Sequence, residues 1–313
     1  METTIDTYKL SNDCSFSIAP GWGCNMFSWI AGGEELMYCP EDYPAAAWKI
    51  TGGGNPLLFP AIGRTYDTSG PEPVQGVYRI YGLEKIFDMP SHGVLYWSKF
   101  TKASEERSEG RISVLYEATI PEKIREESYP FDLSYAQRYT LTESAVELEA
   151  IITNRGDSPA PAAFGYHPYF RVSNSRREGI EVDLPVDKEI LLTSDTILPT
   201  GETIPAEGHI EMKPDIYYDA AYTGASGGRM TLIDRNAKRA IHVDCDDALE
   251  LYVLYTPDGP DFVCIEPWTR GLGAFGDLNG PGWESGNAIP VVRPRETVRY
   301  AAKFSVEQLQ TGG

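Results

Sequence analysis

Ser144-Ala145-Val146-Glu147-Leu148-Glu149-Ala150-Ile151-Ile152 is the stretch that decides the fold, because apolar residues alternate in it with glutamates. In a β-strand, successive side chains point to opposite faces of the sheet. Residues 146, 148, 150 and 152 therefore share one apolar face, while the two glutamates lie on the other. This period of two predicts a strand that packs one face on a core and exposes the other to water.

The same alternation recurs along the chain, at residues 111–120, 249–255 and 298–304. Turn-forming sequences such as Asn154-Arg155-Gly156-Asp157-Ser158-Pro159 separate the alternating segments and suit antiparallel connections. The chain also contains 30 Gly and 23 Pro residues, which disfavour long helices. We therefore predict an all-β protein, a large antiparallel β-sandwich in which residues 1–313 form a single domain.

The chain is strongly acidic, with a formal net charge of -19 over 313 residues. Nucleic acids and anionic membrane surfaces attract clusters of Lys and Arg, so this charge argues against both as partners. No segment approaches the roughly 18 uninterrupted apolar residues that a membrane-spanning helix needs. The composition thus favours a neutral small molecule as the ligand.

The cysteines and the N-terminal segment indicate a reducing compartment. The five cysteines are odd in number and include no C-x-x-C pair, so neither a disulfide framework nor a thiolate zinc site is predicted. Residues 1–10 lack the basic and apolar regions of a signal peptide. We therefore expect a cytoplasmic protein.

Two segments place an ionisable residue in apolar surroundings. In Gly165-Tyr166-His167-Pro168-Tyr169-Phe170, a histidine stands among aromatic residues, and imidazole is the side chain best suited to proton transfer near neutral pH. In Phe262-Val263-Cys264-Ile265-Glu266-Pro267-Trp268, a carboxylate stands in an apolar strand, where it is costly unless it is paired, hydrogen-bonded or protonated. Each residue is either a structural group with satisfied hydrogen bonds or a catalytic one.

Two Gly-rich stretches between residues 55 and 93 are predicted to be loops over a binding face, and residues 271–286 are predicted to form a further long surface loop. Gly271-Leu272-Gly273-Ala274-Phe275-Gly276 matches the dinucleotide-binding fingerprint, but that motif requires a following helix, and we expect a loop instead. No nucleotide cofactor is therefore predicted.

With these segments assembled, the chain resembles the aldose 1-epimerase (galactose mutarotase-like) family over most of its length. The matching segments occur in the order of the family: Asn55-Pro56-Leu57-Leu58-Phe59-Pro60-Ala61-Ile62-Gly63-Arg64, Pro90-Ser91-His92-Gly93, the His167 segment, Asp219 and Cys264-Ile265-Glu266-Pro267-Trp268. The resemblance implies a β-supersandwich that opens and recloses the pyranose ring of a free aldose, and so interconverts its α and β anomers.

The resemblance also implies a role for each of these residues. Ring opening needs a base that takes the proton of the anomeric hydroxyl and an acid that protonates the ring oxygen. The base would be Glu266 and the acid His167, while His92 would hold the ring-oxygen side or share the proton. Arg64 and Asp219 would bind sugar hydroxyls through charge-assisted hydrogen bonds. Neither a metal nor another cofactor is implied.

Aromatic residues are candidate platforms on which a sugar ring stacks. Trp268 is the candidate inside a site segment, and Trp97 and Tyr169 are further ones, although large aromatic residues more often pack in a core. The remaining histidines, His209 and His242, are expected to be structural.

Three alternatives stay open. A carbohydrate-binding protein would keep the same pocket without turnover. A hexose-6-phosphate mutarotase would need convergent cations, for which Arg64, Arg79 and Arg270 are the candidates.

The third alternative is a metal enzyme that uses His92, His167 and Glu266 as a two-histidine, one-carboxylate site. No H-x-H or H-E-x-x-H spacing accompanies these residues, which argues against it. The sequence also leaves open which aldose is bound and whether the protein is a monomer or a homodimer.

Overall fold

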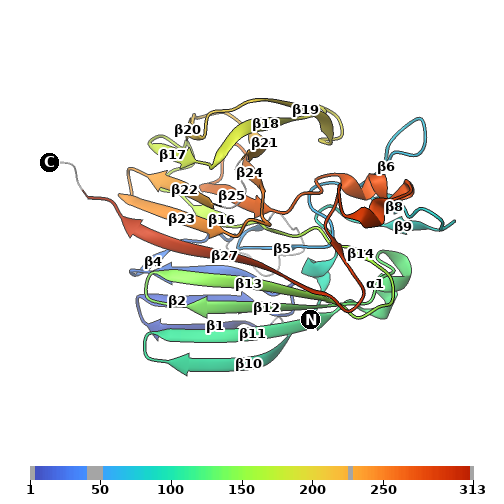
Figure 1. Ribbon diagram of the computed structural model, residues 1–313. Coiled ribbons are helices and arrows are strands. Elements are labelled where there is room, and N and C mark those ends of the chain that lie inside the picture. Colours follow the sequence, from blue (N-terminus) through green and yellow to red (C-terminus); the bar gives the residue numbers. More distant parts are fainter. Residues whose placement is uncertain (1–3, 41–51, 225–227, 311–313) are drawn as a thin grey trace.

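The computed structural model describes residues 4–40, 52–224 and 228–310 (Figure 1). Its largest sheet has nine strands, and neighbouring strands run antiparallel. In spatial order these are β10 (Thr101–Ser108), β11 (Arg111–Thr119), β12 (Leu133–Leu141), β13 (Ala145–Asn154), β27 (Thr297–Gln308), β23 (Arg239–Cys245), β22 (Gly228–Asp234), β17 (Ile180–Asp183) and β20 (His209–Glu211).

A second sheet of eight strands carries the residues of the site. Its order is β19 (Pro199–Pro205), β18 (Val186–Leu192), β21 (Tyr218–Gly224), β24 (Leu251–Thr256), β25 (Phe262–Trp268), β15 (Gly165–Tyr166) and β5 (Leu57–Leu58), and β16 (Tyr169–Arg171) also pairs with β25. Figure 1 shows β24 and β25 next to the β22–β23 end of the large sheet.

Smaller elements complete the fold. A four-stranded sheet contains β1 (Asp6–Ser11), β2 (Cys14–Ala19), β3 (Asn25–Ala31) and β4 (Glu34–Glu35). Two-stranded ribbons pair β14 (Ala160–Pro161) with β26 (Val291–Val292), β6 (Tyr66–Asp67) with β7 (Val74–Gln75), and β8 (Val77–Arg79) with β9 (Ile86–Asp88). The short helical segments are α1 (Glu122–Glu127) and the 3₁₀ turns η2 (Leu95–Trp97), η3 (Ala274–Asn279) and η4 (Trp283–Ser285).

The core lies between the nine-stranded sheet and a second layer made of the other two sheets. Aromatic rings of the four-stranded sheet reach the large sheet, since Phe16 lies 6.0 Å from Tyr139 between ring centroids. Rings from the eight-stranded side do the same, with Phe164 stacked 5.3 Å from Tyr300. One contiguous apolar core therefore joins all three sheets.

The predicted alternation is confirmed in the strands that form the large sheet. In β13, Val146, Leu148 and Ala150 are buried, while the two glutamates between them are partly exposed. Both β11 and β27 show the same one-sided burial. The prediction of an antiparallel β-sandwich is therefore correct.

The prediction of surface loops at residues 55–93 and 271–286 is wrong in part. Residues 55–63 are buried, and they include β5 of the eight-stranded sheet. In the second region, η3 buries Phe275 and Leu278 against the core. Residues 68–75 and 81–86 of the first region are exposed, as predicted.

None of the helices in the described ranges has the length and apolar character that a bilayer span requires.

Candidate active site

A cavity of about 320 Å³ opens on the eight-stranded sheet. Its volume lies at the lower end of the roughly 300–1,000 Å³ typical of small-molecule sites. The predicted catalytic and sugar-binding residues line this cavity: Arg64, His92, His167, Asp219, Glu266 and Trp268. The fold thus brings together residues that are spread over two hundred positions of the chain.

Backbone contacts and a ring contact fix His167. The backbone N–H of His167 donates to Asn55 Oδ1 at 3.1 Å and to the Pro56 carbonyl at 3.2 Å. Its ring stacks on Tyr169, with the centroids 4.7 Å apart and the planes within 3° of parallel. The imidazole is buried and cannot turn freely, so its nitrogens keep a fixed direction.

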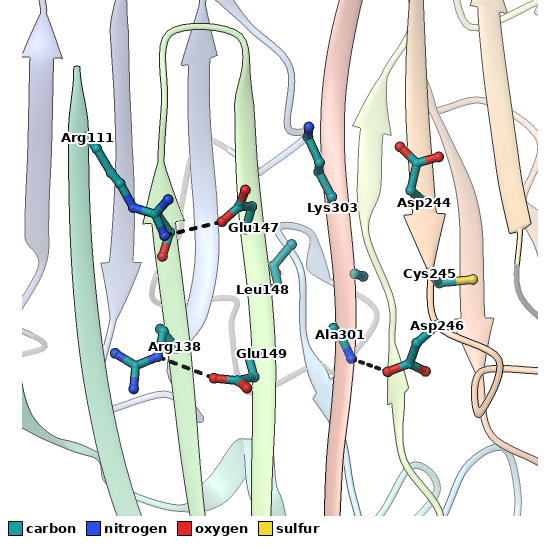
Figure 2. Close-up of a pocket in the computed structure, with 12 residues that line it drawn as sticks. Arg111, Arg138, Glu147, Leu148, Glu149, Asp244, Cys245, Asp246, Ala301 and Lys303 are labelled. Atoms are coloured by element: carbon teal, nitrogen blue, oxygen red, sulfur yellow. Dashed lines mark hydrogen bonds and ion pairs between the residues drawn. The ribbon is translucent and has the colours of Figure 1, made fainter.

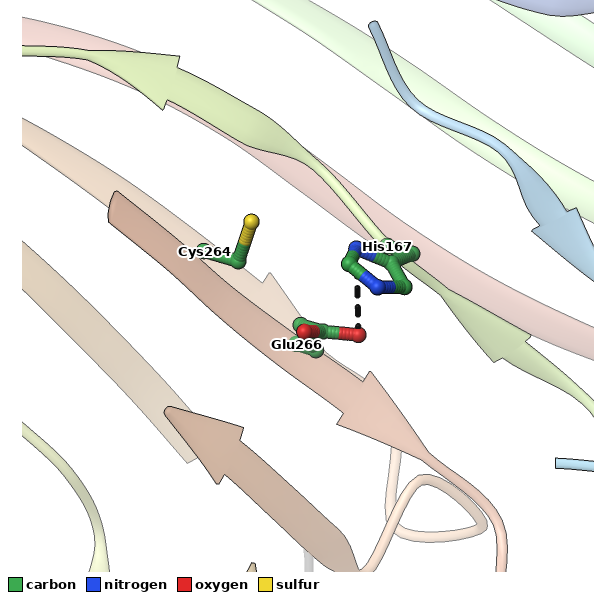
Figure 3. Close-up of side chains that lie close together, drawn as sticks. All are labelled: His167, Cys264 and Glu266. Carbon is green, nitrogen blue, oxygen red and sulfur yellow. Dashed lines mark ion pairs between the residues drawn. The ribbon is translucent and has the colours of Figure 1, made fainter. Parts of the chain in front are cut away.

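Glu266 lies in β25, opposite Val253 of β24, and is fully buried. Glu266 Oε2 is 3.3 Å from His167 Nδ1 (Figure 3), but this geometry is not that of a hydrogen bond. Both carboxyl oxygens and Nδ1 lack a hydrogen-bond partner among the described residues. Because buried polar atoms are rarely left without a hydrogen-bond partner, these atoms are suited to bind a ligand.

Burial also sets the protonation of this pair. Burial, followed by the charge of Asp219, raises the pKa of Glu266 well above its usual range, and the neighbouring Trp268 side chain opposes this only in part. Burial, followed by the charge of His92, lowers the pKa of His167 well below its usual range. Burial thus favours the neutral form of each residue, the carboxylic acid of Glu266 and the uncharged imidazole of His167.

The tautomer of His92 is set by the backbone. The Gly63 N–H donates to His92 Nδ1 at 3.3 Å, so the proton of the neutral ring is on Nε2. Burial and then the Arg64 charge lower the pKa of His92 to about 4. The following Gly93 has φ +85°, and a Cβ there would lie 2.1 Å from the Phe59 carbonyl oxygen, so only glycine fits.

Arg64 and Asp219 bring opposite charges to the cavity wall. The Tyr217 hydroxyl donates to Asp219 Oδ2 at 3.2 Å. Burial raises the pKa of Asp219, while the Tyr217 hydrogen bond and Arg64 partly offset this. Asp219 pairs in register with Tyr255, which also lines the cavity.

The three aromatic residues considered as stacking platforms lie in different parts of the structure. Trp268 lines the cavity but is largely buried, and it packs so closely on Gly165 that a Cβ there would lie 2.4 Å from the indole. Tyr169 lies behind His167 and does not line the cavity. Trp97 is 48% exposed and also lies away from it, so the suggestion of Trp97 as a platform is not supported.

A second depression, of about 470 Å³, lies on the solvent face of the nine-stranded sheet (Figure 2). Its charged side chains already pair with one another, as Arg111 does with Glu147 at 3.5 Å and Arg138 with Glu149 at 3.3 Å. Asp246 accepts the Ala301 N–H at 2.7 Å. These groups have hydrogen-bond or ion-pair partners, whereas His167 Nδ1 and the Glu266 oxygens of the smaller cavity form no hydrogen bond with a described residue.

Several residues that line or support the cavity were not predicted from the sequence. Tyr217, Tyr255, Leu192 and Ile197 line it, and Asn55 holds the His167 backbone. Tyr217 stands directly before the Tyr218-Asp219 pair, which is the one local signal available. The others come from strands and loops that only the fold brings near.

The metal-capable group differs from the set of His92, His167 and Glu266 that was weighed as an alternative. Within the described part of the chain, the possible ligand atoms that cluster belong to His167, Cys264 and Glu266, all buried. His92 is not part of this group.

Solved structures of other proteins share this architecture. The chain matches the Slr1438 protein from Synechocystis sp. PCC 6803 with a TM-score of 0.79 at 23% identity, covering 98% of this chain and 99% of that chain. It matches a galactose mutarotase-like protein from Clostridium acetobutylicum with a TM-score of 0.79 at 17% identity, covering 98% and 99%. It matches galactose 1-epimerase from Lactobacillus acidophilus NCFM with a TM-score of 0.72 at 14% identity, covering 99% and 100%. The fold is therefore that of the galactose mutarotase-like β-sandwich proteins.

The family assignment follows from the sequence itself. The family model for aldose 1-epimerase matches residues 6–285. This chain belongs to the aldose 1-epimerase family, as the order of its site segments predicted.

Proposed function

We propose that this protein is a mutarotase that interconverts the α and β anomers of a free aldose by acid and base catalysis. The observation that carries the proposal is the buried pair of His167 and Glu266, whose facing atoms lie 3.3 Å apart at the cavity. Neither atom has a hydrogen-bond partner among the described residues. Opening a pyranose ring needs one proton taken from the anomeric hydroxyl and one given to the ring oxygen. A pair that shares one proton can do both.

The proton balance supports this role. With Glu266 protonated and His167 neutral, the pair has no net charge, and a shift of the proton to His167 keeps it so. That shift produces the carboxylate base and the imidazolium acid that ring opening uses. The carboxylate then takes the proton from the hydroxyl on C1, the C1–O5 bond breaks, and His167 protonates O5. Closure on the other face of the carbonyl reverses these transfers and gives the other anomer.

The remaining residues would bind the sugar. Arg64 and Asp219 would hold hydroxyls by charge-assisted hydrogen bonds. The Nε2–H of His92 would donate to the ring oxygen or to a neighbouring hydroxyl, since its Nδ1 is occupied by Gly63. Trp268, with an indole Nε1 that has no partner among the described residues, would contribute an apolar face and a donor.

The charges around the cavity favour a neutral aldose over a 6-phosphate. Of the three arginines considered for a phosphate, Arg64 alone lines the cavity. Arg79 pairs with Asp67 at 2.7 Å and Arg270 with Glu250 at 3.2 Å, both away from the cavity lining. A phosphate usually requires several convergent donors, and here two carboxyl groups would face it.

Polarimetry of freshly dissolved sugars tests the proposal. We expect the protein to accelerate the approach to anomeric equilibrium for at least one of glucose, galactose, xylose and arabinose. Glucose 6-phosphate and galactose 6-phosphate should react more slowly than the corresponding free sugars. Rates equal to the spontaneous ones for every sugar, together with sugar binding by calorimetry, would instead identify a carbohydrate-binding protein.

The variant Glu266→Gln tests the base. It keeps the shape of the side chain but removes the basic oxygen, so we expect turnover to fall by about 10²-fold or more. Sugar binding should persist. The matched control is Glu250→Gln, which changes the same group on a partly exposed side chain and should keep its rate. A stable Glu266→Gln protein with a wild-type rate would remove Glu266 from the mechanism.

A further inference from the structure

Cys264 is a fully buried free thiol that the proposed reaction does not use. It lies in β25 two residues before Glu266, so both side chains point to the same face of the sheet. Figure 3 shows its sulfur on the same side of the strand as the Glu266 carboxyl group and near the His167 ring. The thiol therefore belongs to the immediate surroundings of the acid and base pair.

The spacing of these atoms suits a tetrahedral metal ion. One nitrogen, one sulfur and one oxygen from the three residues all lie within 4.8 Å of one another. Around a tetrahedral zinc ion with Zn–N and Zn–O bonds of about 2.0–2.2 Å and a Zn–S bond of about 2.3 Å, ligand atoms are about 3.3–3.6 Å apart. The His167 Nδ1 to Glu266 Oε2 distance is already 3.3 Å. The distances that involve the sulfur are at most 4.8 Å, so they exceed the tetrahedral spacing by at most about 1.5 Å.

The polar atoms at this position lack partners. His167 Nδ1 and both Glu266 oxygens form no hydrogen bond with any described residue, although both side chains are almost fully buried. Burial, and then the charge of Glu266, raises the pKa of the Cys264 thiol well above its usual range, which opposes its ionisation. A dication offsets one carboxylate and one thiolate, so it removes the cost of ionising the two acids together.

We propose that His167, Cys264 and Glu266 form an inhibitory binding site for a thiophilic divalent cation of the zinc class. The mixed nitrogen, sulfur and oxygen donors suit zinc and exclude magnesium and calcium, which take oxygen ligands. His167 and Glu266 line the cavity, so an ion can reach them from solvent. A bound ion occupies both the acid and the base, which prevents proton transfer to a sugar. This inhibition rests on the proposed function, whereas metal binding itself does not.

Cobalt spectroscopy tests the site without any activity measurement. Co²⁺ substitutes for zinc in such sites, and its bond to a thiolate gives a charge-transfer band in the near ultraviolet. Titration of the metal-free, reduced protein with Co²⁺ should produce this band together with the intense visible bands of four-coordinate cobalt. Both should be lost in Cys264→Ala and in Cys264→Ser. Both should persist in the matched control Cys245→Ala, which removes a partly exposed thiol on β23.

Two results would overturn the site. One is the absence of the charge-transfer band in the wild-type protein, and the other is its persistence in both folded Cys264 variants. Circular dichroism of each variant identifies any that does not fold, and having two substitutions keeps the comparison possible. Because the bands report the Co–S bond, an ion bound at surface carboxylates does not imitate them.

Polarimetry with Zn²⁺ then tests the inhibition. Saturating Zn²⁺ should slow mutarotation at least 10-fold, and a chelator should restore the rate. Relative to its own metal-free rate, Cys264→Ala should need at least 10-fold more Zn²⁺ for half inhibition, because a ligand is lost. Equal sensitivity of the two proteins would contradict the inference. A cobalt band without any mutarotation would reject the proposed function and leave the metal site standing.

Discussion

At the scale of single residues, a hydrogen bond and burial limit what the His92 ring can do. Its Nδ1 accepts the Gly63 N–H, which leaves only Nε2–H to face a ligand. Its pKa of about 4 means that the ring stays neutral wherever the protein is studied near neutral pH. His92 is therefore suited to donate a hydrogen bond and poorly suited to act as a cationic acid.

Histidine titration by NMR checks this assignment. We expect the His92 ring signals to stay constant from pH 9 to about pH 5.5, with nitrogen shifts typical of the Nε2–H tautomer. The hydrogen bond to Asp183 raises the pKa of the exposed His209, so its signals should titrate above the ordinary value of 6.5 and serve as the internal control. The variants His92→Asn and His209→Asn assign the signals. A His92 midpoint near 6.5 would show that the ring is not held as described.

At the scale of elements, a buried arginine ties together the strands that carry the cavity wall. Arg177 is fully buried, and its guanidinium donates to the Ile216 carbonyl and the Pro257 carbonyl, each at 2.8 Å. These carbonyls lie just before β21 and just after β24. Asp219 is the second residue of β21 and pairs with Tyr255 of β24, so Arg177 holds the ends of the strands on which both stand.

Arg177→Lys should loosen this end of the sheet. A lysine has a single ammonium group and cannot reach both carbonyls in the fork geometry of arginine, and hydrogen bonds to charged groups contribute about 1.5–3 kcal/mol each. We expect the unfolding free energy to fall by about 2 kcal/mol. Since Asp219 would lose its fixed position, KM for the best sugar should rise more than kcat falls.

The adjacent Arg176→Lys is the control for this variant. Arg176 is exposed and pairs only with Glu178, so this change should alter neither stability nor KM. Kinetics are to be measured well below the melting temperature of each variant. If Arg177→Lys lowers the melting temperature but leaves KM unchanged, Arg177 supports the fold alone and does not position Asp219.

The elements also show which features the sequence could reveal. Alternation in residues 144–152 predicted β13, because one face of that strand contacts the core and the other contacts water. Residues 55–63 were expected outside because they are rich in Gly and Pro. They are inside because distant partners satisfy their polar groups: the Asn55 N–H donates to Asn25 Oδ1, and the Phe59 N–H donates to the His92 carbonyl. Such long-range pairing leaves no local pattern.

For the candidate site, the sequence predicted residues that line the cavity but not the residues that support them. The six residues gathered from the family resemblance converge on one cavity, while their roles stay predictions. The supporting residues could not be read in the same way. Arg177 stands in the charged run Arg176-Arg177-Glu178, whose local sequence predicts exposure. It is buried, and its guanidinium donates to two carbonyls that flank β21 and β24. Cys264 looked like a small apolar core residue until the fold placed it near His167.

At the scale of the whole molecule, the chain has a net charge of -19, and the fold buries some of its acidic side chains. Burial raises the pKa of Asp219, and it also raises that of Asp246, although three backbone N–H groups partly offset the effect there. A folded state with raised carboxyl pKa values binds protons more readily than the unfolded chain. The stability that each such carboxyl group contributes is complete below its pKa in the unfolded chain. This contribution is lost as the pH rises through the pKa of the group in the folded protein.

We therefore expect the protein to be more stable at pH 5 than at pH 7.5. The groups are partly exposed, so solvent screens them and the gain should be on the order of 1 kcal/mol. Below about pH 4 the order reverses. Glu181, whose pKa the hydrogen bond from Arg235 lowers, contributes stability only while it is ionised and loses it as the pH falls through its folded pKa. Denaturant unfolding at pH 7.5, 6, 5 and 3.5 should thus show a maximum near pH 5.

Lower net charge at pH 5 would also reduce self-repulsion, so a charge-matched pair of variants separates the two causes. Asp219→Asn keeps an oxygen that can accept the Tyr217 hydroxyl and removes the titrating group, whereas Asp258→Asn removes one charge from an exposed turn. Both variants have the same net charge at neutral pH. If burial is the cause, the gain between pH 7.5 and pH 5 shrinks in Asp219→Asn and keeps its wild-type size in Asp258→Asn. Equal gains in the two variants would attribute the maximum to overall charge and not to the buried acid of the cavity wall.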